Sequence, residues 1–388
     1  MEQNQRISRP IYKEKSSDMT TVLYFTFVLS LTPYLILFAQ IVSSLWIKKV
    51  SNKEPTPKKE FSAPVSFILT CYNEEKHFFR KINSLLDEQD WIEGSEIIIV
   101  SGGSTDSTDE LLKTFENHPF VQLHRFEKRV SKIAGINYAV KFAKNDFFVF
   151  SDFRQEMKPG SVHILMNNFS DPQIGTVTAT LVDSKNASQP SFARSLMNKM
   201  GWQTSQHSSC LSIFGALYAQ RKTNFREIPE DLLFDDLYVT ASVLGQDTRL
   251  IQEKNAIIYD FNFLQYYDKE RMMRLTRGLL LFLFLHFDVI RKIPFRLRIQ
   301  FLIFKYMKLL FPFSLLLLMV SLTLLLALGE YLVPFAVAFC TVLFLSIPAT
   351  QKILLQTLKF HFYFGLAIVR YISGRERSVF WEKLKIDR

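Results

Sequence analysis

A long uncharged run near the start of the chain constrains its fold more than any other feature. Met19–Ile47 contains no Asp, Glu, Lys or Arg, and Lys48 and Lys49 follow it directly. At a rise of about 1.5 Å per residue, a helix of this length crosses a hydrocarbon core of about 30 Å. We predict one membrane-spanning helix, kinked near Pro33. A cleaved signal peptide is the alternative, but the run is too long for one and no small-residue cleavage site follows it.

Two more uncharged runs, Leu309–Gly329 and Tyr331–Gln351, are separated only by Glu330. They predict a hairpin of two spanning helices with almost no external loop. The turn between them has no basic residue, whereas both outer flanks have several: Arg291, Lys292, Arg296, Arg298, Lys305 and Lys308 before the pair, and Lys352, Lys359, Arg370, Arg375 and Arg377 after it. Because Lys and Arg collect on the cytoplasmic side of membrane proteins, we expect both flanks in the cytoplasm.

The order of the spans then places the other segments. With one span before it and two after it, segment 51–262 faces the same side as the hairpin flanks. We therefore predict an integral protein of the inner or plasma membrane, with its globular domain and C-terminus in the cytoplasm. The expected organisation is a tail and span in 1–50, a cytoplasmic domain in 51–262, amphipathic interface helices in 263–300, and the hairpin with a basic amphipathic tail in 301–388.

The formal net charge of +10 raises the question of nucleic-acid binding, but the charge is unevenly distributed. From Phe263 to the C-terminus there are 18 Lys and Arg against 7 Asp and Glu, and the rest of the chain is close to neutral. Membrane flanks explain this excess, so we expect no nucleic-acid partner. The cysteines, Cys71, Cys210 and Cys340, are far apart and give neither a disulfide framework nor the spacing of zinc ligands.

Within the cytoplasmic segment, short β-branched runs alternate with helical patterns. Five runs have the length and composition of strands: Val65–Cys71, Glu96–Ser101, Val121–Phe126, Phe147–Ser151 and Thr176–Leu181. Helical patterns at Glu75–Leu86 and Thr105–Phe115 separate the first three. The alternation predicts an α/β fold with a mainly parallel sheet and helices on both faces, in which ligands bind beyond the carboxyl ends of the strands.

Unusual polar residues collect at these strand ends. The first strand leads into Tyr72–Glu74, and the second leads into the loop Ser101–Thr108. Small residues in such loops let a backbone approach a ligand, and Ser, Thr or Asp can cap the next helix. Ordinary turn and capping chemistry also explains either motif on its own.

A lysine and several carboxylates follow farther along the chain. Lys132 opens a helical segment that includes Asn137, and Asp152 ends an apolar run shortly before Arg154. A carboxylate at the end of an apolar strand is costly unless it is solvated, paired or bound to a metal. The acidic run Glu230–Asp236 adds further carboxylates, for which a solvated helix face is the alternative.

Taken together and in this order, these residues resemble those of inverting glycosyltransferases of family 2, whose catalytic domains have the nucleotide-diphospho-sugar transferase fold called GT-A. The resemblance extends over nearly the whole chain, including the interface segment, the hairpin and the tail with Trp381. It implies a set of residues that bind the nucleotide-sugar: Tyr72, Asn73, Glu74, Ser101, Gly102, Lys132, Asn137, Asp152, Arg154 and, in the interface segment, Arg274.

The resemblance also implies a chemistry. Asp152 matches the first carboxylate of the family's Asp-x-Asp motif, which holds a divalent cation, Mg²⁺ or Mn²⁺, against the diphosphate. Asp236, the second residue of the pair Asp235-Asp236, matches the catalytic base. In this arrangement the metal stabilises charge on the leaving nucleoside diphosphate, and the base deprotonates an acceptor hydroxyl for in-line attack, which inverts the anomeric carbon.

Three residues are candidates for contacting the acceptor. Gly215 and Ala216 lack bulk and would let a sugar approach, although a packing turn explains them equally well. Trp202 can stack on an acceptor sugar, and a role as a core aromatic is the alternative.

Two departures from the family pattern bear on the donor and the metal. Gly102 stands where the family often has an aspartate that contacts the nucleobase, which leaves uracil and guanine open, with a UDP-sugar favoured over a GDP-sugar. Arg154 replaces the second carboxylate of Asp-x-Asp. Either the metal rests on Asp152 with further donors, among which Glu156 is a candidate, or Arg154 itself neutralises phosphate.

A third departure bears on processivity. Processive members such as cellulose and hyaluronan synthases carry Gln-x-x-Arg-Trp on an interface helix, whereas the matching stretch here has Arg271 for Gln and Leu275 for Trp, while it keeps Arg274 and Gly278. The ring that stacks under the acceptor is therefore missing. Binding to lipid headgroups is an alternative role for these arginines.

We therefore expect an enzyme that transfers a sugar from a cytosolic nucleotide-sugar to a hydroxyl of a membrane-associated acceptor, either lipid-linked or a glycan, without processive polymerisation. Two alternatives stay open. One is a processive polysaccharide synthase that works with a partner, and the other is a catalytically silent subunit that binds a nucleotide-sugar.

Overall fold

The computed structural model describes residues 9–46, 59–86, 89, 91–183, 192–260 and 269–374. The chain divides into two compact units. The first comprises Met1–Gln40, Tyr267–Arg277 and Leu302–Arg377, and the second comprises Ile41–Tyr266, Gly278–Phe301 and Ser378–Arg388. Several features of the sequence lie outside the described residues: the end of the first uncharged run with its lysine pair, the segment 47–58 before the domain, and the tail at Trp381.

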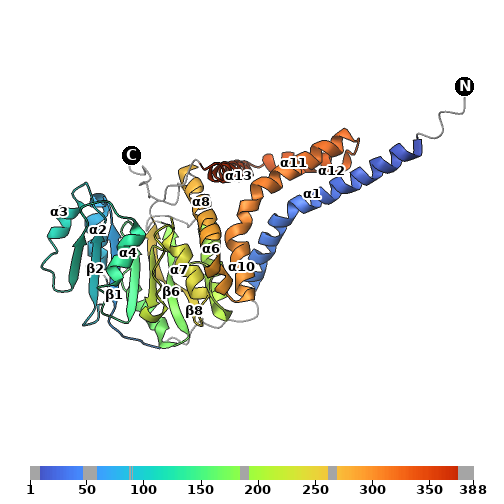
Figure 1. Cartoon of the computed structure of the whole chain (residues 1–388). Helices are drawn as coiled ribbons and strands as arrows, with labels where there is room; N and C mark the ends of the chain where they lie inside the picture. The colour runs from blue at the N-terminus through green and yellow to red at the C-terminus, as the bar shows by residue number, and fades with distance from the viewer. Residues whose placement is uncertain are drawn as a thin grey trace, which may run out of the picture. The chain divides into compact units, whose positions relative to one another are not determined.

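An eight-stranded sheet forms the centre of the second unit (Figure 1). Its strands are β1 (Ser66–Cys71), β2 (Glu96–Ser101), β3 (Val121–Arg125), β4 (Phe147–Asp152), β5 (Glu156–Met157), β6 (Ile174–Asp183), β7 (Leu217–Arg221) and β8 (Arg249–Asp260). Their order across the sheet is β3-β2-β1-β4-β7-β6-β8-β5. β1–β4 run parallel, β7 is antiparallel to β4 and β6, β8 is parallel to β6, and β5 is antiparallel to β8.

The parallel half of the sheet forms from runs that are apolar on both faces. All six residues of β2 are buried, as are five of the six in β1 and in β4. Parallel strands that are covered on both faces typically read as continuous apolar runs. The register pairs Thr70 with Asp152 and Cys71 with Ser101. The loops that follow β1, β2 and β4 therefore leave the sheet side by side at its carboxyl edge.

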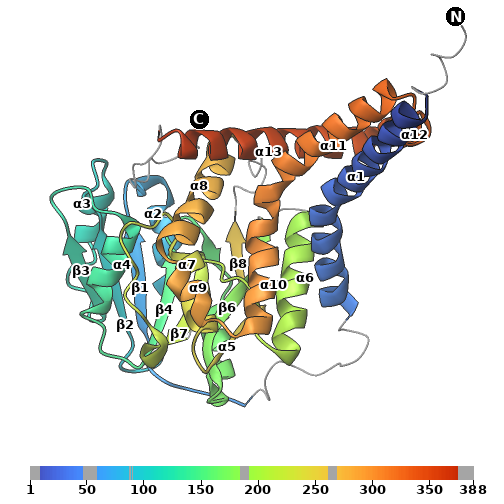
Figure 2. The same ribbon diagram turned by 45° about the vertical axis from the view of Figure 1, so that its right-hand side comes forward.

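Helices cover both faces of the sheet. On one face, Phe78 and Leu85 of α2 (Phe78–Leu86) join a core with Phe67 and Leu69 of β1, to which α3 (Thr108–Lys113) and α5 (Ser161–Met166) add apolar side chains. On the other face, α4 (Lys132–Val140) packs against β1 and β2. There Gly135 allows close approach, because an added Cβ would lie 3.1 Å from Cγ2 of Thr70. In Figure 2, α4 and α7 (Asp235–Leu244) both lie in front of the sheet.

The second unit also contains several other helical segments. α6 (Phe192–His207) packs on β6 and β8, and α9 (Phe287–Lys292) packs on α7. Short 3-10 turns are η2 (Glu75–His77), η3 (Asn167–Ser170) and η4 (Lys222–Asn224). α8 (Lys269–Leu285) and α10 (Phe295–Tyr306) each contribute residues to both units.

The predicted strands are all present, with ends that differ by one or two residues. β4 extends to Asp152, one residue beyond the prediction, and the predicted helix Glu75–Leu86 begins as η2 before it becomes α2. The prediction omitted β5, β7 and β8. Of these, β5 and β7 run against the common direction of the other strands, so the sheet is mainly parallel with two reversed strands. β7 and β8 contain polar residues, such as Gln220 and Glu253, that are buried within the domain and interrupt the apolar pattern.

The first unit consists of helices. Its main elements are α1 (Arg9–Trp46), η6 (Met307–Leu310), α11 (Phe311–Ala327), α12 (Leu332–Leu345) and α13 (Pro348–Ile372). Two side chains link α1 to the later helices: Tyr24 Oη donates to Glu330 Oε2 (3.1 Å), and Tyr34 Oη donates to the carbonyl of Phe311 (3.2 Å).

Within the described residues, two helical stretches are long and apolar enough to cross a membrane, Asp18–Ser44 and Phe295–Ala327. They indicate a membrane-associated chain. The second arm of the predicted hairpin is shorter, because α12 has 14 residues. At the rise of an α-helix it is only about 21 Å long, less than the hydrocarbon thickness.

Candidate active site

An ammonium group held between two carboxylates forms the centre of the candidate site. Lys132 Nζ lies 2.6 Å from Asp152 Oδ1 and 2.9 Å from Asp235 Oδ2, and it donates hydrogen bonds to both oxygens of Asp235. Burial alone lowers the pKa of Lys132, but the charges of Asp152 and Asp235 outweigh burial, and the pKa is raised above its ordinary value. The lysine is therefore a fixed positive charge.

The local fold explains how these three groups meet. Lys132 is the first residue of α4, whose N-cap residue Ser131 accepts a hydrogen bond from the amide of Ala134 (3.0 Å). Asp152 ends β4, and Asp235 opens α7. Carboxylates in the first turn of a helix lie near the positive end of its dipole, which stabilises them. One strand end and two helix starts thus converge on one charge cluster.

Asp236 lies beside this cluster and is half-buried. Gly215 lies next to it, since an added Cβ there would be 3.5 Å from Cβ of Asp236. The carbonyl of Asp236 accepts a hydrogen bond from Thr240 Oγ1 (2.6 Å), which in turn accepts one from the amide of Ile213 (3.1 Å). The start of α7 is thereby tied to the segment that precedes β7. The carboxylate predicted as the base and the glycine predicted at the acceptor are therefore neighbours.

The other two acceptor candidates lie differently. Ala216 is buried, and its carbonyl accepts hydrogen bonds from the amide of Asp152 (3.2 Å) and from Ser151 Oγ (2.7 Å). Its backbone therefore helps to hold the end of β4. Trp202 lies on α6, where the Lys254 ammonium is 4.7 Å from the centre of its ring. The structure thus pairs the Trp202 ring with a lysine, and it does not bring that ring to the charge cluster.

The two loops predicted to contact the nucleotide hold one another in place. Asn73 has a positive φ of 54°, and its Oδ1 accepts a hydrogen bond from the amide of Thr105 (2.7 Å). Ser101 is fully buried, with its hydroxyl bonded to Asp109 Oδ1 (2.5 Å). The amide of Gly102 donates to the carbonyl of Cys71 (2.9 Å). Asn73 and Ser101 therefore shape the loops.

The backbone conformation at position 103, in the same loop, requires a glycine. Its φ is +77°, and an added Cβ would lie 2.6 Å from the carbonyl carbon of Lys128. Only glycine adopts this conformation in so little space. The segment that follows Lys128 is thereby brought against the loop, and it carries Arg129, whose guanidinium lies 4.7 Å from the centre of the Tyr72 ring. Sequence reasoning missed Arg129 because no motif contains it.

Glu74 and Arg154 form an ion pair between the loops that follow β1 and β4. Arg154 Nε lies 3.1 Å from Glu74 Oε1, and both side chains are largely buried. The residue that replaces the second carboxylate of Asp-x-Asp is thus paired with the third residue of the first motif. A guanidinium held this way joins two loops.

Asn137 and Arg274 complete the predicted set. The side chain of Asn137 is buried and exchanges two hydrogen bonds with the main chain of Ile228, at 2.7 and 3.0 Å. It therefore fixes the segment that leads toward α7. Arg274 lies on α8 in the portion that belongs to the first unit, so its proposed contact with the diphosphate stays a prediction.

Part of the chain matches the model of a known protein family. Residues 66–226, which include β1–β7 and the Lys132 and Asp152 positions, match the family model described as glycosyl transferase family 2. This segment is a family 2 glycosyltransferase domain. The resemblance seen in the sequence is thereby confirmed for this segment, which is less than half of the chain.

The chain is also similar to curated proteins. It is 29% identical over 163 residues to the poly-β-1,6-N-acetyl-D-glucosamine synthase of Staphylococcus aureus strain COL, covering 40% of this chain and 39% of that protein. The synthase of the same name from Staphylococcus epidermidis is 28% identical over 116 residues, covering 29% of this chain and 27% of the relative. The chain thus matches about two fifths of the length of the first of these relatives.

A solved structure is similar over most of the chain. The mannosyltransferase PcManGT from Pyrobaculum calidifontis, in complex with GDP-Man and Mn²⁺, superimposes with a TM-score of 0.71 at 18% identity, covering 90% of this chain and 100% of that one. At this identity the similarity concerns the fold alone. The predicted GT-A architecture with accompanying helices is confirmed.

The metal ligands that the described residues offer fit a divalent cation only when a diphosphate completes the site. Among the described residues, no cluster of three or more His, Cys, Asp and Glu side chains can hold a metal. Asp152 offers a carboxylate, but the ammonium of Lys132 lies against it, and Arg154 is directed to Glu74. Mg²⁺ often binds through one or two carboxylates together with substrate phosphates. The residues therefore fit a cation that arrives with a diphosphate, and they do not form a complete site without one.

Two buried polar groups close to the cluster were missed by sequence reasoning. The first, Lys81 on α2, is 1% exposed, and its Nζ donates to Ser151 Oγ (2.6 Å) and to the carbonyl of Gln155 (3.1 Å). Burial lowers the pKa of Lys81 to about 7, against the opposing effect of the nearby Asp152 charge. The sequence does hold a signal, because Lys81 falls within the apolar stripe of α2 next to Ile82.

Tyr218 is the second such group. It is fully buried on β7, its ring stacks on Phe150 with centroids 4.7 Å apart, and its hydroxyl has no hydrogen-bond partner among the described residues. Burial raises the pKa of Tyr218 well above its ordinary value, and the charges of Asp235 and Asp236 add to this. The phenol thus stays protonated near the carboxylates. Nothing in the sequence distinguishes it from an ordinary core tyrosine.

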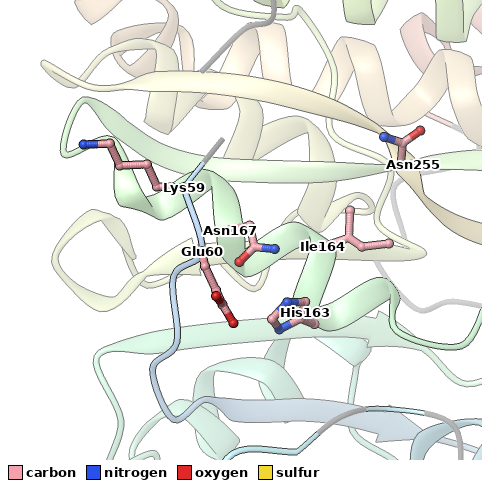
Figure 3. Close-up of a pocket in the computed structure, with 6 residues that line it drawn as sticks. All are labelled: Lys59, Glu60, His163, Ile164, Asn167 and Asn255. Carbon is pink, nitrogen blue, oxygen red and sulfur yellow. The ribbon is translucent and has the colours of Figure 1, made fainter. Parts of the chain in front are cut away.

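Two cavities in the described part of the domain lie in different places, one at the site and one away from it. A small cavity is lined by Lys132, Gly215 and Asp235 together with apolar side chains such as Ile136 and Phe150. A larger one, of about 410 Å³, lies between the segment entering β1 and α5 (Figure 3). Its lining residues are Lys59, Glu60, His163, Ile164, Asn167 and Asn255, none of which belongs to the predicted site.

Proposed function

We propose that this chain is an inverting glycosyltransferase that moves a sugar from a nucleotide-sugar to a hydroxyl of a membrane-associated acceptor. The observation that carries the proposal is the charge cluster: Lys132 held between Asp152 and Asp235, with Asp236 and Gly215 beside it. Lys132 and Asp152 lie in the segment that matches family 2, and Asp235 and Asp236 follow it. A cation for a diphosphate next to a carboxylate that can accept a proton supports sugar transfer.

Asp236, Lys132 and Asp152 have different roles in the proposed reaction. Asp235 accepts hydrogen bonds from Lys132, and Asp236 is half-buried beside Gly215. We assign the base that takes the proton of the acceptor hydroxyl to Asp236, because it matches the family's base and lies next to this glycine. Lys132 is the charge that faces the diphosphate. The acceptor oxygen attacks the anomeric carbon as the bond to the nucleoside diphosphate breaks, and this single displacement inverts the configuration. Asp152 would hold Mg²⁺ or Mn²⁺, which supplies charge stabilisation for the leaving group.

The donor proposed is a UDP-sugar. The curated relatives are named as synthases of a polymer of N-acetyl-D-glucosamine, whereas the similar mannosyltransferase is in complex with GDP-Man. We favour N-acetylglucosamine or a related hexose carried by UDP, and the GDP-sugar is the competing donor. The Tyr72 ring with Arg129 over it offers a flat, cationic surface on which a base can stack.

The proposed acceptor is lipid-linked or a glycan held at the membrane. The two long apolar helices support membrane association. The excess of Lys and Arg around the later helices supports a cytoplasmic position for the domain and the C-terminus. A nucleotide-sugar made in the cytosol then reaches the site directly.

The test is donor turnover by the purified full chain in nanodiscs, with a panel of UDP- and GDP-sugars, with and without Mg²⁺ or Mn²⁺. Asp236→Asn is expected to lower turnover roughly 100- to 10,000-fold, as loss of a general base does, while donor binding persists. Glu230→Gln removes an exposed carboxylate from the same acidic run and is the matched control with unchanged turnover. Equal activity of wild type and Asp236→Asn would contradict the assignment, and donor binding without any turnover would favour a binding subunit.

Processive synthesis is a second candidate, because the curated relatives are named as polymer synthases. Against it, Arg271 and Leu275 stand where processive members have Gln and Trp. Product length separates the two: single-sugar addition gives one new residue per acceptor, and processive synthesis gives long chains at low enzyme-to-acceptor ratio.

A further inference from the structure

The helix that carries the two candidate carboxylates begins without a side-chain cap. Its N-cap residue, Phe234, has an extended backbone (φ −134°, ψ 114°) and makes no capping hydrogen bond. A helix start that lacks a polar cap loses about 1 kcal/mol relative to one with Ser, Thr, Asp or Asn. The position of Asp235 and Asp236 must therefore be secured by other contacts.

Gly278 of α8 provides such a contact. It is buried, and an added Cβ would overlap Cδ2 and Cε2 of the Phe234 ring and lie 3.4 Å from its Cζ. Glycine inside a helix costs about 1 kcal/mol relative to alanine. Here the missing side chain leaves the space that the edge of the Phe234 ring occupies, so the ring fits directly against the backbone of α8.

The segment that follows Gly278 contacts the same helix at further points. Phe282 meets Tyr238 of α7 edge to face, with ring centroids 6.4 Å apart, and His286 Nε2 lies 2.9 Å from Oδ1 of Asp231 in the segment that precedes α7. At the far end of α7, an added Cβ on Gly245 would lie 3.2 Å from Cβ of Lys292. Residues 278–292 therefore run along α7 from its first residue to its last, and Gly278 is the contact at the end that carries the carboxylates.

We propose that Gly278 is a positioning residue for the proposed base, acting through the ring of Phe234. This inference rests on the proposed function, since it assigns to Asp236 the role of the base. A side chain at Gly278 pushes the ring outward, the ring moves the N-cap of α7, and the carboxylate of Asp236 moves with it. Catalysis is sensitive to such a shift, because a misplacement of about 1 Å can cost on the order of 100-fold in rate.

The test compares four forms of the full chain in nanodiscs: wild type, Gly278→Ala, Phe234→Leu, and the double variant. Gly278→Ala is expected to lower kcat roughly 10- to 100-fold, with the KM for the nucleotide-sugar within about threefold of wild type. The double variant is expected to recover most of the loss, because leucine is shorter than the ring and makes room for the new methyl group. If Gly278 mattered only for general stability, adding Phe234→Leu would not restore kcat.

Gly245→Ala is the matched control, since it makes the same substitution between the same two segments at the opposite end of α7. Its kcat is expected to stay within about threefold of wild type. If Gly278→Ala does not yield folded protein, Phe234→Ala reaches the contact from the other side and is expected to lower kcat about tenfold. Wild-type kcat in Gly278→Ala, or in Phe234→Ala, overturns the proposal, as does a double variant no faster than Gly278→Ala.

Hydrogen exchange of the peptide Asp235–Leu244 gives a readout that does not depend on the reaction. Faster exchange in Gly278→Ala, reversed in the double variant, supports the packing even if no donor is turned over by wild type. In that case the proposed function fails and the contact stands. Unchanged exchange together with unchanged kcat removes the contact as a determinant of α7.

Discussion

The two halves of the sheet hold their site residues by different means. In the parallel half, β3-β2-β1-β4, polar side chains connect the loops at the carboxyl edge, as Asn73 does with Thr105 and Glu74 does with Arg154. In the mixed half, β7-β6-β8-β5, the helix that carries Asp235 and Asp236 is held by apolar packing and close backbone approach together with the hydrogen bond from the amide of Ile213 to Thr240.

The two ways of holding residues fit the different roles that the two halves have in the proposed function. Hydrogen bonds and ion pairs fix direction, so a loop network suits a surface that has to present a set of groups to a charged nucleotide. Close packing fixes the position of one helix against another, which is what the proposed base requires, because a shift of about 1 Å can cost on the order of 100-fold in rate. The two halves are joined along β4 and β7, and at the site the Lys132 ammonium connects Asp152 of the first half with Asp235 on α7.

Lys132→Gln breaks this junction and is expected to have the largest effect. Transfer should fall roughly 100- to 1,000-fold, since a preorganised charge facing the diphosphate is lost. At the same time, Mn²⁺ should bind more tightly to the nucleotide-free chain, because the Asp152 carboxylate no longer has an ammonium 2.6 Å away. Electron paramagnetic resonance of free Mn²⁺ measures this affinity directly.

Lys141→Gln serves as the control, because Lys141 is exposed at the other end of α4. It should leave both transfer and Mn²⁺ affinity unchanged. If Lys132→Gln binds Mn²⁺ no more tightly than wild type, then Lys132 and the cation do not compete for Asp152, and the view of the site as one completed only by a diphosphate is wrong.

The same division explains what the sequence could predict. The strands of the parallel half were located to within two residues, because strands buried on both faces read as apolar runs such as Phe67–Leu69. In the mixed half, β7 and β8 were missed. β8 contains Glu253 and Lys254 in its middle, and its register with β6 shifts between Thr178 and Thr180, so no simple period is visible.

Candidate residues were easier to find than their partners. The motifs located Asp152, Lys132 and Asp235, which the structure brings together. The pairing of Arg154 with Glu74, however, joins positions far apart in the chain, and only the register of β1 with β4 brings their loops together. Likewise, Gly278 was noted only as part of a motif, because a contact between two helices leaves no local pattern.

Breaking the Glu74–Arg154 pair should have the next largest effect, on stability rather than on chemistry. Arg154→Met removes this ion pair from the Glu74 carboxylate, which is 6% exposed, and is expected to cost about 3–5 kcal/mol. Glu74→Leu should cost a similar amount, and the two together should cost less than either alone. The thermal midpoint of the chain in detergent follows these differences.

The double variant also distinguishes two roles for Arg154. If the guanidinium only joins the loops, Glu74→Leu with Arg154→Met should keep the KM for the nucleotide-sugar near that of wild type. If Arg154 instead neutralises phosphate, stability should recover while the KM rises by about tenfold or more. A double variant that is less stable than both single variants would show that the two side chains do not act as a pair.

The smallest expected effect concerns Lys81, which ties α2 to the end of β4 in the parallel half. Its pKa is about 7 in the folded chain and higher when unfolded, so between these values the unfolded chain binds more protons. Stability should therefore rise with pH above about 7, by at most about 1.4 kcal/mol per pH unit from this group.

Lys81→Met should flatten the rise in thermal midpoint between pH 7 and about pH 9. Lys113→Met, on the exposed surface of α3, should leave that rise unchanged. An identical pH profile in wild type and Lys81→Met would mean that the buried amine keeps its proton in the folded chain, and that the hydrogen bonds to Ser151 and Gln155 are made by an ammonium.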